Sequence, residues 1–375
     1  MPEHFAAGRG RALRRWFLVA CAGAAALALE PAQALARYAS FIIDANTGRE
    51  LHARNADSQR YPASLTKMMT LYMLFEQIEA GRVGLEDRMA VSAHAAMKAP
   101  TKLGLRAGQT LRVRDAILGL ITKSANDAAA VIAEHLGGSE EEFARMMTRK
   151  ARSLGMSRST FQNASGLPDS EQVTTARDMA ILGIALAEHF PTYYRFFSTR
   201  AFAFNGRVHA NHNKLLGRVP GVDGIKTGYT HASGFNLVSS VRRDGRHVVA
   251  VVLGGPTARA RDAHMRDLLA KHVSAASSHR AVASLVARPG RSPTGASAVA
   301  QAEAAKPVEK LVATPAAALS PQALPAPQPK PVTEIVKPAV QSSSTVAEAF
   351  AALGYAQNGT PSAARPAPQD DTAEP

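Results

Sequence analysis

The chain has 375 residues, and 46% of them are apolar, which is enough to bury the core of one or two domains. The formal charge of +14 is concentrated in residues 37–277, where 32 Lys and Arg stand against 21 Asp and Glu, a difference of +11. A basic domain can bind nucleic acid. The sequence has no basic helix with base-reading side chains and no aromatic stacking ladder, so we expect no nucleic-acid partner and favour an anionic envelope polymer.

Residues 1–36 have the pattern of a secretory signal. Four arginines within residues 9–15 precede an apolar run, Trp16 to Leu29, and Ala34-Leu35-Ala36 forms a small-x-small cleavage site. The run is too short to span a bilayer comfortably. We therefore expect export to the periplasm or cell envelope, outside the cytoplasmic membrane. An uncleaved anchor, a lipoprotein box ending at Cys21 and a twin-arginine signal are the alternatives.

Cys21 is the only cysteine and lies in this leader, so the mature chain can form no internal disulfide and has no thiol nucleophile. The sequence also contains no Cys–His zinc spacing. His209 and His212 are three residues apart, but no His-Glu-x-x-His accompanies them, so a loop pair is the better interpretation. We expect neither a metal site nor a cofactor.

The first element predicted after the leader is a β-hairpin. Residues 39–45 and 51–53 have strand character, and Asn46-Thr47-Gly48 between them is a turn. The hairpin therefore supplies the first strands of a sheet.

A helix is predicted next, between Pro62 and Gly81, because apolar residues recur at helical spacing over residues 68–78. Ser64 and Lys67 share one face of its first turn. A hydroxyl one turn from an amine is a nucleophile beside a candidate base, and a helix N-terminus offers N–H groups to a developing anion. Ser-x-x-Lys alone is common by chance, and a capping serine with a solvated lysine is the plain alternative.

The second polar motif is Ser124-Ala125-Asn126, between predicted helices at residues 113–122 and 127–135. The second helix is predicted to end at Gly137-Gly138. A helix-loop-helix lets a polar triplet project into a cleft while both of its flanks stay buried. Taken alone, these side chains would be expected to cap the second helix.

The remaining elements complete the sheet and its cover. They are predicted helices at residues 140–154, 177–189 and 259–275, a loop at 161–175, and strands at 202–204, 237–241 and 248–253. The last two strands are joined by an Asp-Gly turn at Asp244-Gly245. An antiparallel sheet built from both chain ends, with helices between them, is an α+β layered architecture.

A third motif, Lys226-Thr227-Gly228, follows in the segment Val222 to Thr230. In this order, Ser-x-x-Lys, Ser-x-Asn and Lys-Thr-Gly resemble the penicillin-binding serine acyltransferases and the serine β-lactamases. The flanks Pro-Ala-Ser-Leu-Thr-Lys-Met, Lys-Ser-Ala-Asn-Asp-Ala-Ala, Asn-Ala-Ser-Gly-Leu-Pro and Val-Asp-Gly-Ile-Lys-Thr-Gly-Tyr-Thr resemble the D-alanyl-D-alanine carboxypeptidases, the low-molecular-mass penicillin-binding proteins. The resemblance runs from about Phe41 to about Leu253 and implies the β-lactamase/transpeptidase-like fold.

The resemblance also implies roles for the site residues. Ser64 would form an acyl-enzyme with Lys67 as its base, and Ser124 would relay the proton to the leaving amine. The other roles concern substrate: Asn126 would orient its amide, Lys226 and Thr227 of the Lys-Thr-Gly triplet with Gly228 would hold its terminal carboxylate, and the N–H groups of Ser64 and Tyr229 would form the oxyanion hole.

One position departs from the family pattern. Members often carry Asn-x-Asn before a Leu-Leu pair, and here Asn211-His212-Asn213 precedes Leu215-Leu216. Some relatives have arginine at the middle position, where it assists carboxylate binding. His212 therefore leaves the detail of the carboxylate pocket open.

The leading functional hypothesis is a serine-type D-Ala-D-Ala carboxypeptidase that trims peptidoglycan stem peptides and is acylated by β-lactam antibiotics. A D,D-endopeptidase that cuts cross-links is the nearest alternative. A secreted β-lactamase would need a deacylating carboxylate, and neither Glu171 nor Glu188 has an Asn four residues on. The intact motifs argue against a non-enzymatic wall-binding protein, and the lack of Gly-x-Ser-x-Gly argues against an α/β-hydrolase.

The domain boundaries follow from composition. Residues 1–36 are the signal, residues 37–277 form the D,D-peptidase domain, and residues 278–375 are predicted to be a disordered Ala/Pro-rich tail holding 14 of the 22 prolines. Related carboxypeptidases often carry a second β domain and a C-terminal amphipathic anchor, and the sequence shows neither. Membrane or envelope tethering is left open.

Overall fold

The computed structural model describes residues 37–289, so the predicted signal and residues 290–375 of the predicted tail lie outside the described residues. The strands are β1 (Ala39–Asp44), β2 (Glu50–Arg54), β3 (Arg88–Ala90), β4 (Thr110–Arg112), β5 (Ala201–Phe204), β6 (Arg207–Ala210), β7 (Val222–Thr230), β8 (Gly234–Arg243) and β9 (Arg246–Gly255). The helices are α2 (Lys67–Glu79), α3 (Ala93–Met97), α4 (Val113–Thr122), α5 (Asn126–Gly137), α6 (Glu140–Ser153), α7 (Ala176–His189), α8 (Pro191–Tyr194) and α9 (Ala258–His272). Three 3₁₀ turns complete the set: η1 (Ala63–Thr66), η2 (Arg195–Ser198) and η3 (Val273–Ala275).

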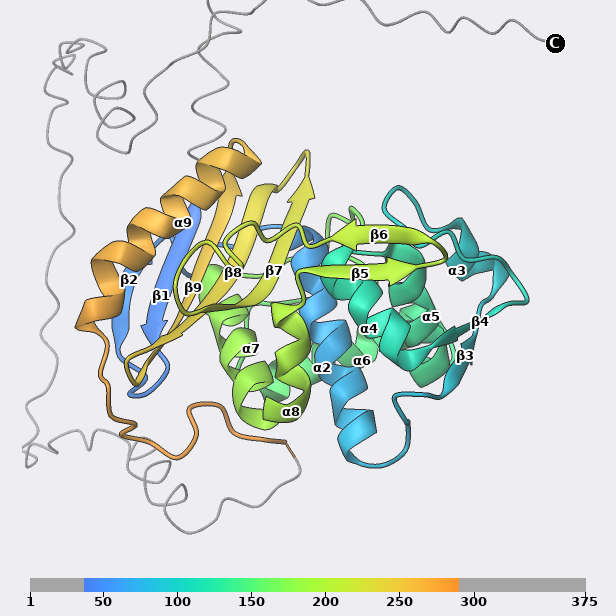
Figure 1. Ribbon diagram of the computed structural model, residues 1–375, viewed down its shortest axis with the longest axis horizontal. Helices are drawn as coiled ribbons and strands as arrows, with labels where there is room; N and C mark the ends of the chain where they lie inside the picture. Colours follow the sequence, from blue (N-terminus) through green and yellow to red (C-terminus); the bar gives the residue numbers. More distant parts are fainter. Residues whose placement is uncertain (1–36, 290–375) are drawn as a thin grey trace, which may run out of the picture. The chain divides into compact units, whose positions relative to one another are not determined.

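Both ends of the described chain meet in one five-stranded sheet, in the order β2-β1-β9-β8-β7 (Figure 1). All of its neighbouring strands are antiparallel, and β1 pairs with β9 from Ala39 opposite Leu253 to Asp44 opposite Val248. β8 and β9 are joined by Asp244-Gly245, whose φ angles of 53° and 75° are those of a type I′ hairpin turn. The predicted sheet, built from both chain ends, is confirmed.

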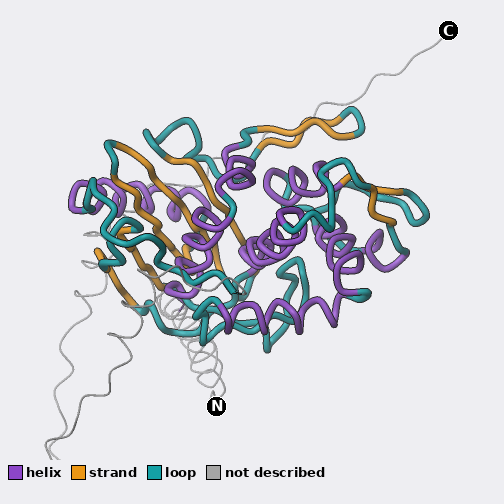
Figure 2. The backbone as a smooth tube through the Cα atoms, turned by 90° about the horizontal axis from the view of Figure 1, so that it is seen from below, coloured by secondary structure: helices purple, strands orange, loops and turns teal. Residues whose placement is uncertain are grey.

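Helices cover both faces of this sheet. Because side chains alternate along a strand, Val248 and Ala250 of β9 pack with Met265 of α9, whereas Val249 and Val251 join the core formed with α2 and α7. Figure 1 shows α9 along one face of the sheet, and Figure 2 shows the strands of the sheet gathered apart from most of the helices. β7 is left at one edge of the sheet, where it contacts η1.

α2 is the central helix of the molecule and is buried over most of its length. This fits its sequence, which is apolar on all sides. The predicted helix at residues 113–122 is confirmed with the same bounds as α4, and α5 begins one residue before its predicted start. The helix predicted from Pro62 is divided, because η1 precedes α2. Within residues 37–289, no helix is both long and apolar enough to cross a membrane.

The predicted start of the tail at residue 278 is wrong, because residues 278–289, here called the strap, pack on the domain. The Glu188 carboxylate at the end of α7 accepts hydrogen bonds from Arg280 at 2.5 Å and from Ser284 Oγ at 2.8 Å. The backbone O of Val286 lies 2.9 Å from His189 Nε2, and the Val286 side chain is buried. Alanine and serine at the start of the strap mark a composition shift, but Leu285 and Val286 still bring apolar surface to the core.

Candidate active site

The three polar motifs meet where η1, the α4–α5 junction and edge strand β7 come together. A cavity of about 590 Å³ opens there. Its lining includes these predicted site residues: Ser64, Ser124, Asn126, His212, Thr227, Gly228 and Tyr229. The other two, Lys67 and Lys226, have exposed fractions of 0% and 1%. The fold therefore assembles residues far apart in the chain around one opening.

Ser64 lies in η1 and not in an α-helix as predicted. Residues i and i+3 lie above one another in a 3₁₀ turn. Lys67, three residues after Ser64, is the first residue of α2, and its Nζ lies 3.2 Å from Ser64 Oγ. The turn is entered through Ala63, whose φ of 49° is unusual for a residue with a side chain. Gly166 presses against this entry, since a Cβ there would lie 1.9 Å from Ala63 O. Ser64, the candidate nucleophile, therefore lies in a turn whose first residue, Ala63, is strained and packs against Gly166.

The Lys67 amine is surrounded by three oxygens. Besides Ser64 Oγ, it donates to Asn126 Oδ1 at 2.7 Å and to the backbone O of Ser165 at 2.5 Å. A neutral amine has two N–H donors and one lone pair. With the two donors used on Asn126 and Ser165, the lone pair of the neutral form is left for the Ser64 hydroxyl.

Burial is the main reason that the pKa of Lys67 is lowered well below its usual value, and the charge of Lys226 lowers it further. The carboxylates of Glu140 and Asp127 act in the opposite direction and raise this pKa. The amine therefore gives up its proton far more readily than a solvated lysine, which a general base at neutral pH requires.

Ser124 lies in the turn between α4 and α5, and Asn126 is the first residue of α5. Ser124 has a φ of 61°, and its buried Oγ has no hydrogen-bond partner among the described residues. An unpaired buried hydroxyl is costly, so it is available to a group bound in the cavity. The Asn126 amide is occupied instead: its Oδ1 accepts from Lys67, and its Nδ2 donates to Ala99 O at 2.8 Å.

Edge strand β7 forms the opposite wall of the cavity. Glycine at position 228 lets it pass close to η1, because an added Cβ would lie 3.1 Å from both Pro62 O and Ser64 N. Tyr229, the next residue, is 53% exposed and stacks on Phe235 with 4.2 Å between ring centroids. Ser64 and Tyr229 consequently both line the cavity.

Burial, and then the charge of Arg261, lower the pKa of Lys226 to about 7. Desolvation, followed by the charge of Lys226, lowers the pKa of His212 to about 4, so this imidazole is neutral at pH 7. His212 therefore does not replace the arginine of some relatives as a cation.

Arg261 is a site residue that sequence reasoning missed. It lies on α9, is only 3% exposed and lines the cavity. Its guanidinium donates to Asn236 O and to Asp262 Oδ1, each at 2.9 Å. In the sequence it is one of several basic residues on the closing helix, and nothing local distinguishes it. Arg261 is thus a buried cation in the cavity lining, and its charge acts on Lys226, which lies on β7 next to the lining residue Thr227.

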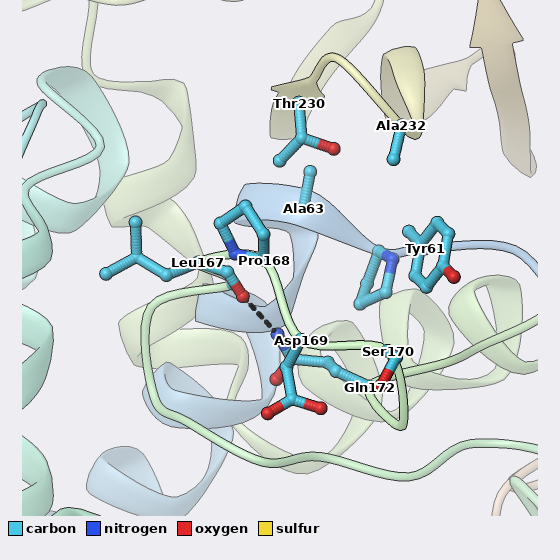
Figure 3. Close-up of a pocket in the computed structure, with 11 residues that line it drawn as sticks. Tyr61, Ala63, Leu167, Pro168, Asp169, Ser170, Gln172, Thr230 and Ala232 are labelled. Carbon is cyan, nitrogen blue, oxygen red and sulfur yellow. Dashed lines mark hydrogen bonds between the residues drawn. The ribbon is translucent and has the colours of Figure 1, made fainter.

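A second cavity of about 290 Å³ adjoins the first (Figure 3). The two share four lining residues, Gly166, Leu167, Pro168 and Thr230. The remainder of the second cavity is lined by Tyr61, Pro62, Ala63, Asp169, Ser170, Gln172 and Ala232. The loop between them is braced by Gln172, whose amide donates to Leu167 O at 3.0 Å. A ligand longer than the first cavity can therefore continue over these shared residues into the second.

A serine with a buried lysine beside it, in a cavity whose lining includes the cation of Arg261, defines a candidate serine acyltransferase. The family model described as D-alanyl-D-alanine carboxypeptidase, Peptidase S11, matches residues 26–257. The chain belongs to this family, as its motifs predicted.

Similar proteins agree with this membership. The chain is 36% identical to the D-alanyl-D-alanine carboxypeptidase DacA of Escherichia coli (strain K12) over 235 residues, 61% of this chain and 58% of the relative. It is 32% identical to DacF of Bacillus subtilis (strain 168) over 237 residues, 61% of this chain and 60% of the relative. The chain thus spans about three fifths of the length of these curated relatives.

Solved structures confirm the fold. Penicillin binding protein 5 of Haemophilus influenzae is similar with a TM-score of 0.60 and 34% identity, covering 62% of this chain and 69% of that chain. Penicillin-binding protein D2 of Listeria monocytogenes, in its ampicillin-bound form, gives a TM-score of 0.54 and 29% identity, covering 62% of this chain and 95% of that chain. The predicted β-lactamase/transpeptidase-like α+β fold is therefore correct.

Proposed function

We propose that this protein is a serine-type D-Ala-D-Ala carboxypeptidase that removes the terminal D-alanine from peptidoglycan stem peptides. The observation that carries the proposal is the Lys67 amine, whose donors are used on Asn126 and Ser165 so that its lone pair is directed to Ser64, 3.2 Å away. The family, and the carboxypeptidase names of its relatives, support the same activity.

In the first half of the reaction, neutral Lys67 takes the Ser64 proton while Oγ attacks the carbonyl carbon of the penultimate D-alanine. The N–H groups of Ser64 and Tyr229 stabilise the oxyanion that forms. Ser124, with its unpartnered hydroxyl, relays the proton that Lys67 took from Ser64 to the leaving nitrogen, which returns Lys67 to its neutral form. The C–N bond then breaks, D-alanine departs, and the shortened stem remains as an ester on Ser64.

The terminal carboxylate selects the substrate. Lys226 and Thr227, with Gly228 beside them, hold this carboxylate on the β7 wall, and Arg261 adds a second cation close by.

In the second half of the reaction, a water attacks the ester as Lys67 takes its proton. Lys67 then gives this proton to Ser64 Oγ, so Ser64 leaves as the alcohol and the free acid is released.

A D,D-endopeptidase that cuts cross-links is the second candidate. The adjoining cavity favours it, because it gives a longer peptide room beyond the 590 Å³ site. Incubating the full chain with a pentapeptide and with a cross-linked dimer, and following both by mass, separates the two. Loss of one D-alanine from the pentapeptide, with the dimer intact, supports the carboxypeptidase, whereas faster cleavage of the dimer would overturn that choice.

The described residues that line the main cavity offer no free carboxylate for a β-lactamase activity. Among the described residues that line the main cavity, the only carboxylate is Asp262, which is paired with Arg261 at 2.8 Å. Glu188 is engaged by the strap, and Glu171 accepts from Gln162 Nε2 at 3.0 Å. Neither of these two candidate acids lines the cavity.

We further propose that penicillin acylates Ser64 and is released slowly. A relative of known structure has been solved in an ampicillin-bound form, and the strained amide and carboxylate of a β-lactam fit the same nucleophile and cationic wall. Intact mass after mixing should show one penicillin per chain, and none in Ser64→Ala. Rapid catalytic destruction of penicillin would instead indicate a β-lactamase.

We also propose export, on the pattern of residues 1–36, and a role for the protein outside the cytoplasmic membrane. The folded peptidase domain then begins near residue 37 and includes the strap. Fractionation of cells that express the full chain tests this, because the activity and a shortened N-terminus should be found together in the exported fraction. Recovery of the intact leader in the cytoplasm would contradict it.

A further inference from the structure

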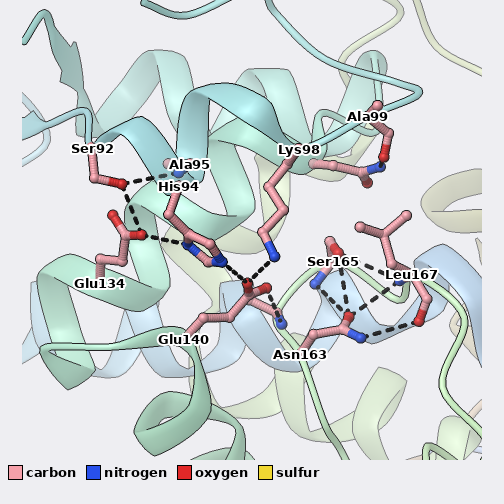
Figure 4. A network of polar contacts seen from close by, with 12 residues as sticks. Ser92, His94, Ala95, Lys98, Ala99, Glu134, Glu140, Asn163, Ser165 and Leu167 are labelled. Atoms are coloured by element: carbon pink, nitrogen blue, oxygen red, sulfur yellow. Dashed lines mark hydrogen bonds and ion pairs between the residues drawn. The ribbon is translucent and has the colours of Figure 1, made fainter. Parts of the chain in front are cut away.

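Three glutamates begin α6, and only one of them is turned inward. Glu140 has an exposed fraction of 4%, whereas Glu141 is exposed and Glu142 is partly exposed. A buried carboxylate is costly unless it is paired. Glu140 is paired: Oε2 lies 2.6 Å from Lys98 Nζ, and Oε1 accepts from the backbone N–H of Ala164 at 3.1 Å. Figure 4 shows this carboxylate between the two segments that carry its partners.

The first arm of this network leads through Ala164 to the amine of Lys67. The N–H of Ala164 is held by Glu140, and its carbonyl accepts from Thr70 Oγ1 at 2.7 Å. The next carbonyl along the chain, Ser165 O, accepts from Lys67 at 2.5 Å. The position of that acceptor is therefore set by a peptide that Glu140 and Thr70 hold from both sides.

The second arm leads through Lys98. Its ammonium is held by Glu140, and the carbonyl of the next residue, Ala99, accepts from Asn126 Nδ2 at 2.8 Å. Asn126 Oδ1 is the other acceptor of the Lys67 amine, at 2.7 Å. Both oxygens that take N–H bonds from Lys67 are thus linked to one buried carboxylate.

We propose that Glu140 is a positioning residue for the nucleophile and base, holding through Ala164 and Lys98 the two segments that direct the Lys67 lone pair to Ser64. The proposal rests on the proposed acyl-transfer function of the same site. Glu140 is not among the residues that line the cavity, so its action passes through other residues.

The negative charge of Glu140 also changes the pKa of the Lys67 amine. Glu140, from α6, and Asp127, from α5, raise the pKa of Lys67, while Lys226 on β7 lowers it in addition to burial. Around Glu140 itself, Lys98 and His94 Nε2 face the carboxylate at 2.6 and 3.6 Å, and His94 Nδ1 also meets Glu134 at 2.8 Å. Removing the Glu140 charge therefore lowers the pKa of Lys67 and frees its lone pair at lower pH.

The test measures acylation of the full chain by a fluorescent penicillin, as a rate constant across pH, in wild type and Glu140→Gln. Glutamine can still accept from Ala164, but its amide cannot hold the Lys98 ammonium, so acylation at high pH should fall about ten- to a hundredfold. As pH decreases, the ratio of variant to wild-type rate should rise, because the acid limb of the variant moves to lower pH. Glu141→Gln, with the same charge change on the exposed neighbour, should follow the wild-type curve.

A second variant separates the effect of the length of the Glu140 side chain from the effect of its charge. Glu140→Asp keeps the negative charge but shortens the side chain, so its plateau rate should fall while its acid limb stays in place. A rate ratio for Glu140→Gln that does not change with pH, or a plateau equal to that of the wild type, would overturn the positioning role. Failure of wild type to be acylated at Ser64 would instead overturn the proposed function.

Discussion

The two walls of the cleft each contain a buried lysine, and their surroundings differ. Lys67, at the start of α2, has three oxygens within 3.2 Å of its amine. Lys226, on β7, donates one hydrogen bond, to Thr227 O at 2.9 Å, within the described part of the chain. Burial lowers the pKa of both groups, so burial alone does not distinguish their roles.

The two amines differ in how many of their N–H groups have a hydrogen-bond acceptor. Lys67 has acceptors for both N–H groups of its neutral form and one hydroxyl left for its lone pair. Lys226 uses one N–H group on Thr227 O and has further N–H groups for a ligand. Among the described residues no carboxylate pairs with Lys226, whereas the nearby Arg261 is paired with Asp262. A fully surrounded amine suits proton transfer, and an incompletely surrounded cation suits an anionic ligand.

The comparison is tested most strongly by arginine at each position. Lys67→Arg should lower acylation by penicillin about 10²–10⁴-fold, because arginine stays charged and cannot take the Ser64 proton. Lys226→Arg should retain most acylation, since that wall requires a cation and no lone pair. Labelling rates measured for both variants check this, and equal losses would break the distinction between the walls.

Removing the charge from β7 should affect substrate binding more than chemistry. Lys226→Met is expected to raise KM for a peptide ending in a free carboxylate about ten- to a hundredfold, the range for losing a hydrogen bond to a charged group. Steady-state kinetics with the free acid and with its C-terminal amide provide the measurement. A KM for the amide that rises just as much would show that Lys226 shapes the wall without binding the carboxylate.

Much of this arrangement could be predicted because it depends on short spacing. Ser64 and Lys67 are three residues apart, and Ser124 and Asn126 lie between two helices whose apolar patterns are strong. Strand patterns at both ends of the domain predicted a sheet built from both, and the structure adds that β1 pairs with β9. The short spacing is kept in the structure, although Ser64 lies in η1 and not in the predicted α-helix.

Contacts made only by tertiary packing could not be predicted. Arg261 and Glu140 are each one charged residue among several on a helix, and their burial depends on how α9 and α6 meet other elements. The strap was missed for a similar reason, because Leu285 and Val286 pack on the core from within a segment whose composition resembles a linker. Asn126 was expected to face substrate, and its bonds to Lys67 and Ala99 depend on neighbours far away in the chain.

The pKa of Lys226 gives a pH test of the same wall. This pKa is lowered to about 7 in the folded site, so the ammonium loses its charge as pH rises through that value. KM for the free-acid peptide should therefore increase above neutral pH, by at most about tenfold per pH unit, as the charged fraction falls. The amide substrate serves as the control and should show a flat KM over the same range.

The smallest expected effect concerns His212, the departure from the family pattern. This imidazole, with a pKa of about 4, adds no charge at neutral pH. His212→Arg should lower KM for the free acid about two- to fivefold, the range of a partly exposed ion pair. His209→Arg makes the same charge change on β6, outside the cavity lining, and should have a smaller effect. If both variants lower KM equally, the gain comes from long-range attraction, and Lys226 and Arg261 already satisfy the carboxylate without help from position 212.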